Sequence, residues 1–176
     1  MAVGNLEFIQ EFSIADNTTD ADIDNVFSDK YDVYLITLTN YNNKTDTGGN
    51  RTQIRFIDSA GNVETGASDY AYASLALHAG TSFSEHKDAA NSLIDDVNRV
   101  DTTASGNTNV IVYNPYSSSS YTFCQWQSTT QSDPSTLMGF KGIGVLKLAE
   151  SMRGIRFRQV GNMGGDNIKC SVYGVK

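Results

Sequence analysis

The sequence predicts an all-β protein, an antiparallel β-sandwich of about eight to ten strands with one or two short helices. Apolar and polar residues alternate with period two in many short runs, most clearly in residues 153–160 (RGIRFRQV) and 168–175 (IKCSVYGV). The chain also has 15 Gly and only 2 Pro, which is typical of many tight turns. A Gly/Asn-rich turn at 161–167 joins the last two runs, so we expect a closing hairpin that ends the chain inside a sheet.

The strand candidates follow one another with turn residues between them. Residues 31–39 (YDVYLITLT) are nearly apolar on both faces, which predicts a central strand. In the first candidate, Phe8, Phe12 and Ile14 are expected to share one face. The predicted strands are residues 6–14, 31–39, 51–57, 70–79, 109–113, 121–127, 140–148, 153–160 and 168–175.

Two segments have helical spacing. Residues 20–28 (DADIDNVFS) place Ile23 and Phe27 on one side of a helix of one or two turns. Residues 88–97 place Ala89, Leu93 and Val97 four apart, which also fits a helix. Because a short apolar run is ambiguous, residues 92–97 fit an edge strand equally well, and both alternatives stay open.

Length and composition restrict the class. The 176 residues fit a single domain, residues 1–176, with enough chain to bury a core. A formal net charge of −7 argues against nucleic acid as a partner, because an acidic surface repels phosphates. No run approaches the ~20 apolar residues of a membrane helix, and the first residues show no signal peptide. We therefore expect no membrane partner and assembly in the cytoplasm.

Candidate metal and catalytic residues are few, so we expect no cofactor, no metal and no enzymatic activity. Asp20-x-Asp22-x-Asp24 resembles the start of a calcium loop, but the Gly and Glu that such a loop needs are replaced by Asn25 and Tyr31. The acidic run is instead expected to cap a short helix. The chain has no G-x-S-x-G motif and no phosphate-binding loop. A pair of carboxylates for glycoside cleavage stays open, since sequence spacing does not test it.

The two cysteines, Cys124 and Cys170, are too few for a disulfide framework or a zinc site. They are expected to be small buried side chains or free thiols, and a single inter-strand disulfide is the alternative.

Four aromatic residues flank a serine-rich turn: Tyr113, Tyr116, Tyr121 and Trp126. Aromatic rings beside hydroxyl and amide side chains are typical of surfaces that contact sugars or proteins. The alternative is that Tyr113, Tyr121 and Trp126 are core residues of strands, with the serines exposed in a loop. The sequence favours the core, and the four aromatics are the candidate contact residues.

The closing pattern resembles small virion structural proteins of tailed bacteriophages. The residues that carry the resemblance are Gly154-Ile155-Arg156-Phe157, Gly161-Asn162 and Val172-Tyr173-Gly174, together with the segment 27–34 (FSDKYDVY). The resemblance implies a jelly-roll-like sandwich that serves as a capsid decoration protein or as a tail or fibre component.

The function expected from class and resemblance is that of a non-enzymatic structural protein of a tailed-phage virion. The most specific form is a cement protein on the capsid exterior that bridges major capsid or other virion proteins. A homo-oligomer is expected, with a trimer favoured. The alternative is a module of a tail or fibre that binds a receptor or a carbohydrate such as a host-surface glycan, with Tyr116 and its neighbours as the contact.

Overall fold

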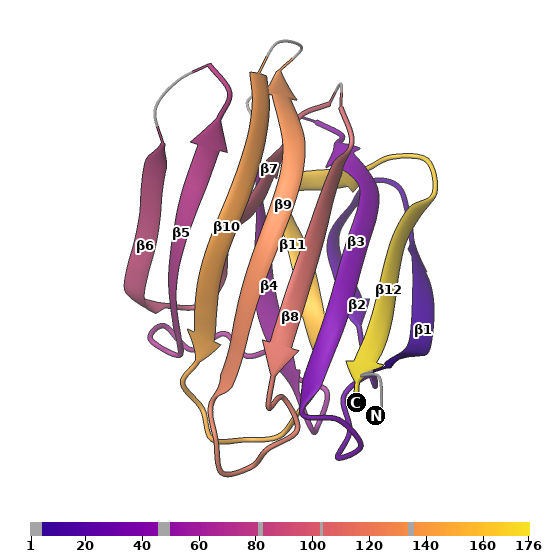
Figure 1. Ribbon diagram of the computed structural model, residues 1–176, viewed down its shortest axis with the longest axis vertical. Helices are drawn as coiled ribbons and strands as arrows, with labels where there is room; N and C mark the ends of the chain where they lie inside the picture. Colours follow the sequence, from indigo (N-terminus) through magenta and orange to yellow (C-terminus); the bar gives the residue numbers. More distant parts are fainter. Residues whose placement is uncertain (1–4, 46–49, 81–82, 103, 134–135) are drawn as a thin grey trace.

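The computed structural model describes the chain except residues 1–4, 46–49, 81–82, 103 and 134–135, and the described part contains twelve strands (Figure 1). The strands are β1 (Leu6–Ile14), β2 (Thr18–Ile23), β3 (Val33–Asn43), β4 (Asn50–Asp58), β5 (Tyr70–His78), β6 (Ser84–Asn91), β7 (Ile94–Val100), β8 (Gly106–Tyr113), β9 (Thr122–Asp133), β10 (Thr136–Leu146), β11 (Met152–Gly164) and β12 (Ile168–Val175). Every pairing between them is antiparallel, so the all-β prediction is confirmed.

The strands form two facing layers. The larger layer has the order β6-β5-β10-β9-β8-β3-β12-β1, and the smaller has the order β2-β11-β4-β7. The two layers are continuous at one corner, where the end of β11 pairs with the end of β3. The arrangement is a sandwich that is nearly closed on this side, and the larger layer faces the viewer in Figure 1.

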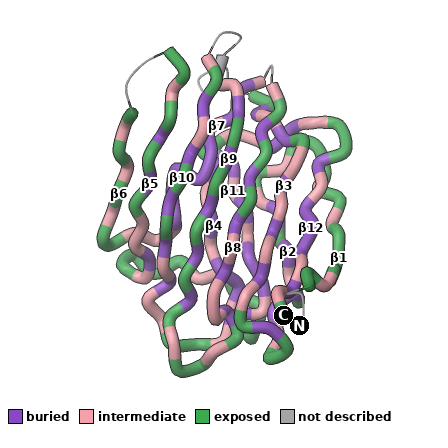
Figure 2. Tube along the Cα trace, in the orientation of Figure 1, coloured by how far each residue is buried: buried purple, intermediate pink, exposed green. Residues whose placement is uncertain are grey.

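The core lies between the layers and follows from the period-two pattern. In β3, Tyr34, Ile36 and Leu38 are fully buried, and they alternate with partly exposed residues. The facing layer contributes Ile54 of β4 and Phe157 of β11, also fully buried. Figure 2 shows the same alternation of buried and exposed residues along β8, β9 and β10. Full burial of such side chains stabilises the fold by about 1.5–3 kcal/mol each.

The predicted helices are wrong, because the described residues contain no helix and therefore none that could cross a membrane. Residues 20–23 are the end of β2, in which Ala21 and Ile23 are buried and Asp22 is exposed. Residues 88–91 end β6, and Ile94–Val100 forms β7 at the edge of the smaller layer, as the edge-strand alternative required. Pairing with β11 and β4 overrides a weak local helical spacing.

The prediction that the last two strands form a hairpin with each other is also wrong. β11 pairs with β2 and β4 in the smaller layer, whereas β12 lies between β1 and β3 in the larger layer. The turn, with positive φ at Gly165 and Asn167, carries the chain from one layer to the other. The alternation of residues specifies which face of a strand is buried, but it does not specify the partner strand. That the chain ends inside a sheet is confirmed.

A β-bulge corrects the expected face of β1. The register with β12 shifts between Phe8 and Gln10, and the extra residue reverses the faces on either side of it. Phe12 and Ile14 pack against the core as expected, together with Ile9. Phe8 instead points outward, where its ring lies edge-on to that of Tyr173.

Both cysteines are buried free thiols, so the disulfide alternative is excluded. Burial raises the pKa of both the Cys124 thiol and the Cys170 thiol to about 12.

Candidate functional site

The outer face of the larger layer carries the most distinctive surface of the described chain. Because neighbouring strands are in register, the outward residues form rows that cross the sheet. One row is mostly polar and comprises Glu85, Leu75, Lys141, Gln127, Asn109, Thr37, Ser171 and Glu11. We call it the polar row.

Two further rows follow, each two residues further along the strands. The mixed row comprises Lys87, Ala73, Ile143, Gln125, Ile111, Leu35, Tyr173 and Phe8. The apolar row comprises Ala71, Val145, Phe123, Tyr113, Val33, Val175 and Leu6. The face therefore changes from amide and charged side chains at the polar row to aliphatic and aromatic side chains at the apolar row.

Two adjoining hollows lie on this face and together form what we call the sheet-face groove. One hollow has a volume of about 870 Å³ and is lined by residues of the polar and mixed rows, among them Leu75, Gln127 and Ile143. The second has a volume of about 850 Å³ and is lined by residues of the mixed and apolar rows, among them Phe123 and Tyr113. Both hollows share Gln125 and Ile143, so the groove is continuous along the strand direction.

The composition of the groove suits a ligand that has both apolar and hydroxyl-bearing faces. Ile143 is 64% exposed and Phe123 is 45% exposed, so the floor of the groove presents apolar surface to a ligand. Gln125 and Gln127 lie beside them on the same face and are exposed, and their amide groups can both donate and accept hydrogen bonds. An apolar floor with a few polar groups is the usual makeup of a small-molecule site.

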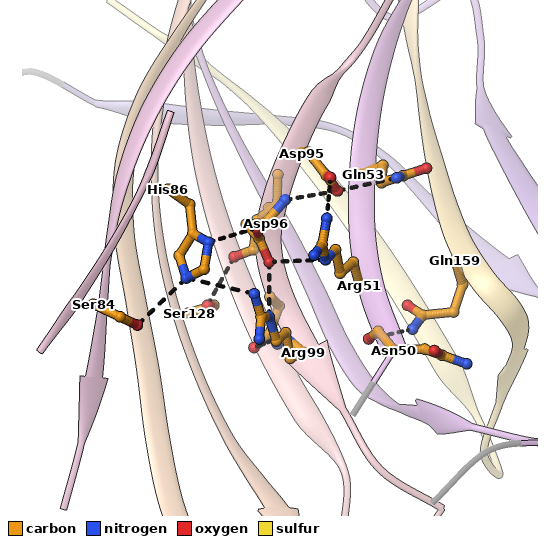
Figure 3. A network of polar contacts seen from close by, with 12 residues as sticks. Asn50, Arg51, Gln53, Ser84, His86, Asp95, Asp96, Arg99, Ser128 and Gln159 are labelled. Carbon is orange, nitrogen blue, oxygen red and sulfur yellow. Dashed lines mark hydrogen bonds and ion pairs between the residues drawn. The ribbon is translucent and has the colours of Figure 1, made fainter. Parts of the chain in front are cut away.

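A second candidate site is a cluster of charged residues at the side of the sandwich where β6, β7 and β4 meet (Figure 3). Asp96 is almost fully buried at a bulge of β7 and has a positive φ of 53°. Its carboxylate oxygens lie 2.7 Å from Arg99 Nε, 3.2 Å from His86 Nδ1 and 3.5 Å from Arg51 Nε.

The neighbouring Asp95 is paired as well. It accepts hydrogen bonds from Arg51 Nη1 at 2.8 Å and from Gln53 Nε2 at 3.0 Å. Burial, followed by the charges of Asp95 and Asp96, raises the pKa of the nearby Tyr72 to about 12. Arg51 and Arg99 lie on β4 and β7 of the smaller layer, whereas His86 lies on β6 of the larger layer, so the contact between His86 and Asp96 links the edges of the two layers. The described residues contain no group of three or more potential metal ligands here or elsewhere.

The acidic run Asp20-x-Asp22-x-Asp24 is neither a cap nor a metal loop. It lies along β2 and just beyond it, opposite Arg153, Arg156 and Arg158 of the paired strand β11. The hydrogen bond from Arg153 lowers the pKa of Asp24 below its usual range. These pairs account for both the acidic run and the basic cluster.

The four candidate aromatics are separated by the structure. Tyr113 belongs to the apolar row and lines the groove. Tyr116 and Tyr121 are 43% and 46% exposed in the connection between β8 and β9. Trp126 is buried in the core with 2% exposure, because it lies on the opposite face of β9 from Gln125 and Gln127. The groove residues Ile143 and Lys141 were not predicted, although their alternation with Gly142 and Gly144 marks them as outward-facing.

No family model and no curated protein matches the chain. Similar solved structures include the marine PL-14 alginate lyase from Aplysia kurodai, with 8% identity over 94% of this chain and 80% of that chain and a TM-score of 0.35. The endo-β-1,4-glucuronan lyase from Trichoderma reesei has 7% identity over 98% and 85%, with a TM-score of 0.32. The CBM2 module of the evolved Dit of Lactobacillus casei BL23 phage J-1 has 8% identity over 93% and 75%, with a TM-score of 0.24.

These comparisons correct one expectation from the sequence. Two of the three structures are lyases, so the prediction that the chain has no enzymatic activity is withdrawn. The third structure is a module of a phage protein, and none of the three is described as a capsid decoration protein. At these TM-scores the likenesses assign no role to any residue.

Proposed function

We propose that this chain is a carbohydrate-binding protein and that it holds an extended glycan in the sheet-face groove. The single observation that carries the proposal is the combination of exposed Ile143 and Phe123 with the outward amides of Gln125 and Gln127 in one continuous hollow. A sugar ring presents an apolar face of C–H groups and a rim of hydroxyls. Aromatic and aliphatic side chains suit the first, and amides suit the second.

The shape and rigidity of the groove also favour a polymeric ligand. Its floor consists of β5, β10, β9 and β8, which are paired along their length, so little conformational entropy is lost on binding. From the polar row to the apolar row the floor extends by four residues, or about 13 Å. This length accommodates more than one sugar ring.

Together with the resemblance to tailed-phage proteins, this site suggests a module of a virion tail or fibre that contacts a host-surface glycan. A glycan-binding module of a tail or fibre is the alternative that the sequence left open. The sequence placed its contact at Tyr116 and its neighbours, whereas we place it on the sheet face.

Glycan-array screening followed by titration calorimetry tests the proposal. Phe123→Ala is expected to lower the affinity for a bound oligosaccharide by at least about fivefold, because stacking on an aromatic ring contributes about 1 kcal/mol or more. The matched control is Phe83→Ala, since Phe83 is 68% exposed just before β6 and does not line the groove. Absence of binding across the array, or equal losses in both variants, would contradict the proposal.

The cement role on a capsid is a second candidate, and the apolar row favours it. Seven neighbouring strands contribute apolar residues to this row, the last being exposed Leu6 on the edge strand β1, beside exposed Phe8 of the mixed row. The whole outer face of eight strands spans about 34 Å, and its area is of the order of 1,000 Å². A specific protein interface needs about 800 Å² per partner, so the contact would extend from the apolar row over most of this face.

The occupant proposed for the apolar row is a neighbouring copy of the chain, in a homo-oligomer such as a trimer. Light scattering of the purified protein is expected to give a mass above that of the monomer, and Leu6→Asp with Phe8→Asp is expected to return it to the monomer. A monomer at every concentration would rule this candidate out and leave the glycan proposal standing.

A further inference from the structure

Among the described residues, Lys141 is the one cationic side chain that lines the sheet-face groove away from its β6 edge. Strands β5, β10, β9, β8 and β3 together contribute five residues to each of the three rows, and Lys141 is the one charged residue among them as the structure describes these strands. Its side chain is exposed in the middle of the sheet. Its cross-strand neighbours are Leu75 on β5 and Gln127 on β9, neither of which carries a charge.

Most other cations of this acidic chain are paired. Arg153 and Arg156 bind aspartates of the β2 segment, Lys169 binds Glu11, and Lys176 binds Glu7. By contrast, no carboxylate of the described residues lies within ion-pair distance of Lys141. A lysine without a carboxylate partner, set in an uncharged and partly apolar surface, is available to an anionic group of a ligand.

Charged residues of β6 also line one edge of the groove, and each of them has a partner close by. On β6, Glu85 and Lys87 form a loose exposed pair with 3.7 Å between Glu85 Oε2 and Lys87 Nζ. Leu75 separates Glu85 from Lys141 in the polar row, so the two lie about 10 Å apart across two strand spacings. Asp88, at the rim of the second hollow, is occupied by hydrogen bonds from the Ala90 backbone and Asn91.

We infer that the groove selects an acidic glycan and that Lys141 contacts the anionic group of one sugar residue while Gln127 and Asn109 hydrogen-bond its hydroxyls. This inference rests on the proposed function, because it names the ligand class of the same groove. The anionic group is a carboxylate or a phosphate, which a lysine binds as a point charge in either case. Apolar contacts with Ile143 and Leu75 hold the uncharged face of the same ring.

The test uses three probes of similar length: oligogalacturonate, which carries carboxylates, oligomeric ribitol phosphate, and neutral cello-oligosaccharide. Titration calorimetry at low and high salt gives the affinity of the wild-type protein for each. One acidic probe is expected to bind about tenfold more tightly than the neutral one, with the difference shrinking at high salt. The acidic probe that binds identifies the carboxylate or the phosphate as the recognised group.

Two substitutions locate the charge. Lys141→Gln is expected to remove most of the preference for the acidic probe and to leave the affinity for the neutral probe within about twofold, whereas Lys141→Arg keeps the preference. Lys176→Gln is the matched control, because it removes one exposed positive charge outside the groove. Circular dichroism checks that each variant is folded.

The outcomes separate the two proposals. Equal affinity for acidic and neutral probes, or a loss of preference in Lys176→Gln as large as that in Lys141→Gln, overturns the inference and leaves the glycan-binding proposal intact. Failure of all three probes, together with an empty glycan array, overturns the proposed function and this inference with it.

Discussion

Asp22 on β2 and Arg156 on β11 are directly opposite each other on the outer face of the smaller layer, and Arg156 Nη2 lies 2.6 Å from Asp22 Oδ2. Arg156 Nε contacts the second carboxylate oxygen, so the pair has two parallel hydrogen bonds. The neighbouring positions repeat the relationship, with Arg153 bound to Asp24 and Arg158 near Asp20. This ladder of opposite charges fixes the register of the edge strand β2.

Asp22→Asn is expected to lower the free energy of unfolding by about 0.5–1 kcal/mol, because the pair is two-pronged but partly exposed to solvent. The effect should decrease in high salt. Urea denaturation at two salt concentrations measures both quantities. The charge-swapped double variant Asp22→Arg with Arg156→Asp should recover part of the loss; no recovery would show that the ladder does not act through charge.

Gly142 and Trp126 form a cross-strand pair in which the glycine provides the space for the indole ring. A Cβ atom at Gly142 would lie 2.2 Å from Trp126 Cζ2, so Gly142→Ala is expected to cost about 1–3 kcal/mol of stability. Gly80→Ala is the matched control, since nothing lies within 4 Å of its Cβ position. Thermal denaturation of both variants checks this, and equal melting temperatures would refute the packing argument.

Asp96 is the buried anion on which Arg51, Arg99 and His86 converge. Asn tolerates the positive φ at this position, so Asp96→Asn removes the charge without adding backbone strain. We expect a loss of about 3 kcal/mol, because the removal leaves Arg99 without its buried carboxylate partner, whereas Arg51 keeps Asp95. Asp29→Asn, at an exposed position, should change the free energy of unfolding in urea by less than about 0.5 kcal/mol. If Asp96→Asn changed the free energy of unfolding as little as Asp29→Asn does, the cluster around Asp96 would not hold the layers together.

Glu7 connects the first strand to the end of the chain. Hydrogen bonds from Lys176 and Lys30 lower its pKa from 4.5 to about 2. Because the folded-state pKa is the lower one, this carboxylate stabilises the fold above pH 4.5, and the contribution is lost as the pH falls toward about 2.

Glu7→Gln should therefore destabilise the protein at pH 6 and have little effect near pH 2, which unfolding curves at both pH values will measure. A destabilisation of equal size at both values would show that the effect does not come from the charge of Glu7.

The sequence determined the strands better than their arrangement. Alternation identified the buried side chains of β4 and β12, since the pleat of a strand fixes which residues share a face whatever its partner. The same rule failed at Phe8, because a bulge in β1 reverses which residues face the core. It also failed in residues 20–28, whose weak helical spacing predicted a helix although residues 20–23 pair with β11 far along the chain. Neither the bulge nor the distant pairing can be read from the local sequence.

The sheet-face groove shows the same division. The sequence alone determined that Gln125 and Gln127 share a face of one strand, opposite to that of Trp126. Only the tertiary structure decided that β9 lies between β10 and β8, which places Ile143 and Lys141 on one side of these amides and Ile111 and Asn109 on the other. The physical reason is that a strand's face depends on its own pleat, whereas its neighbours depend on the hydrogen bonding and packing of the whole chain.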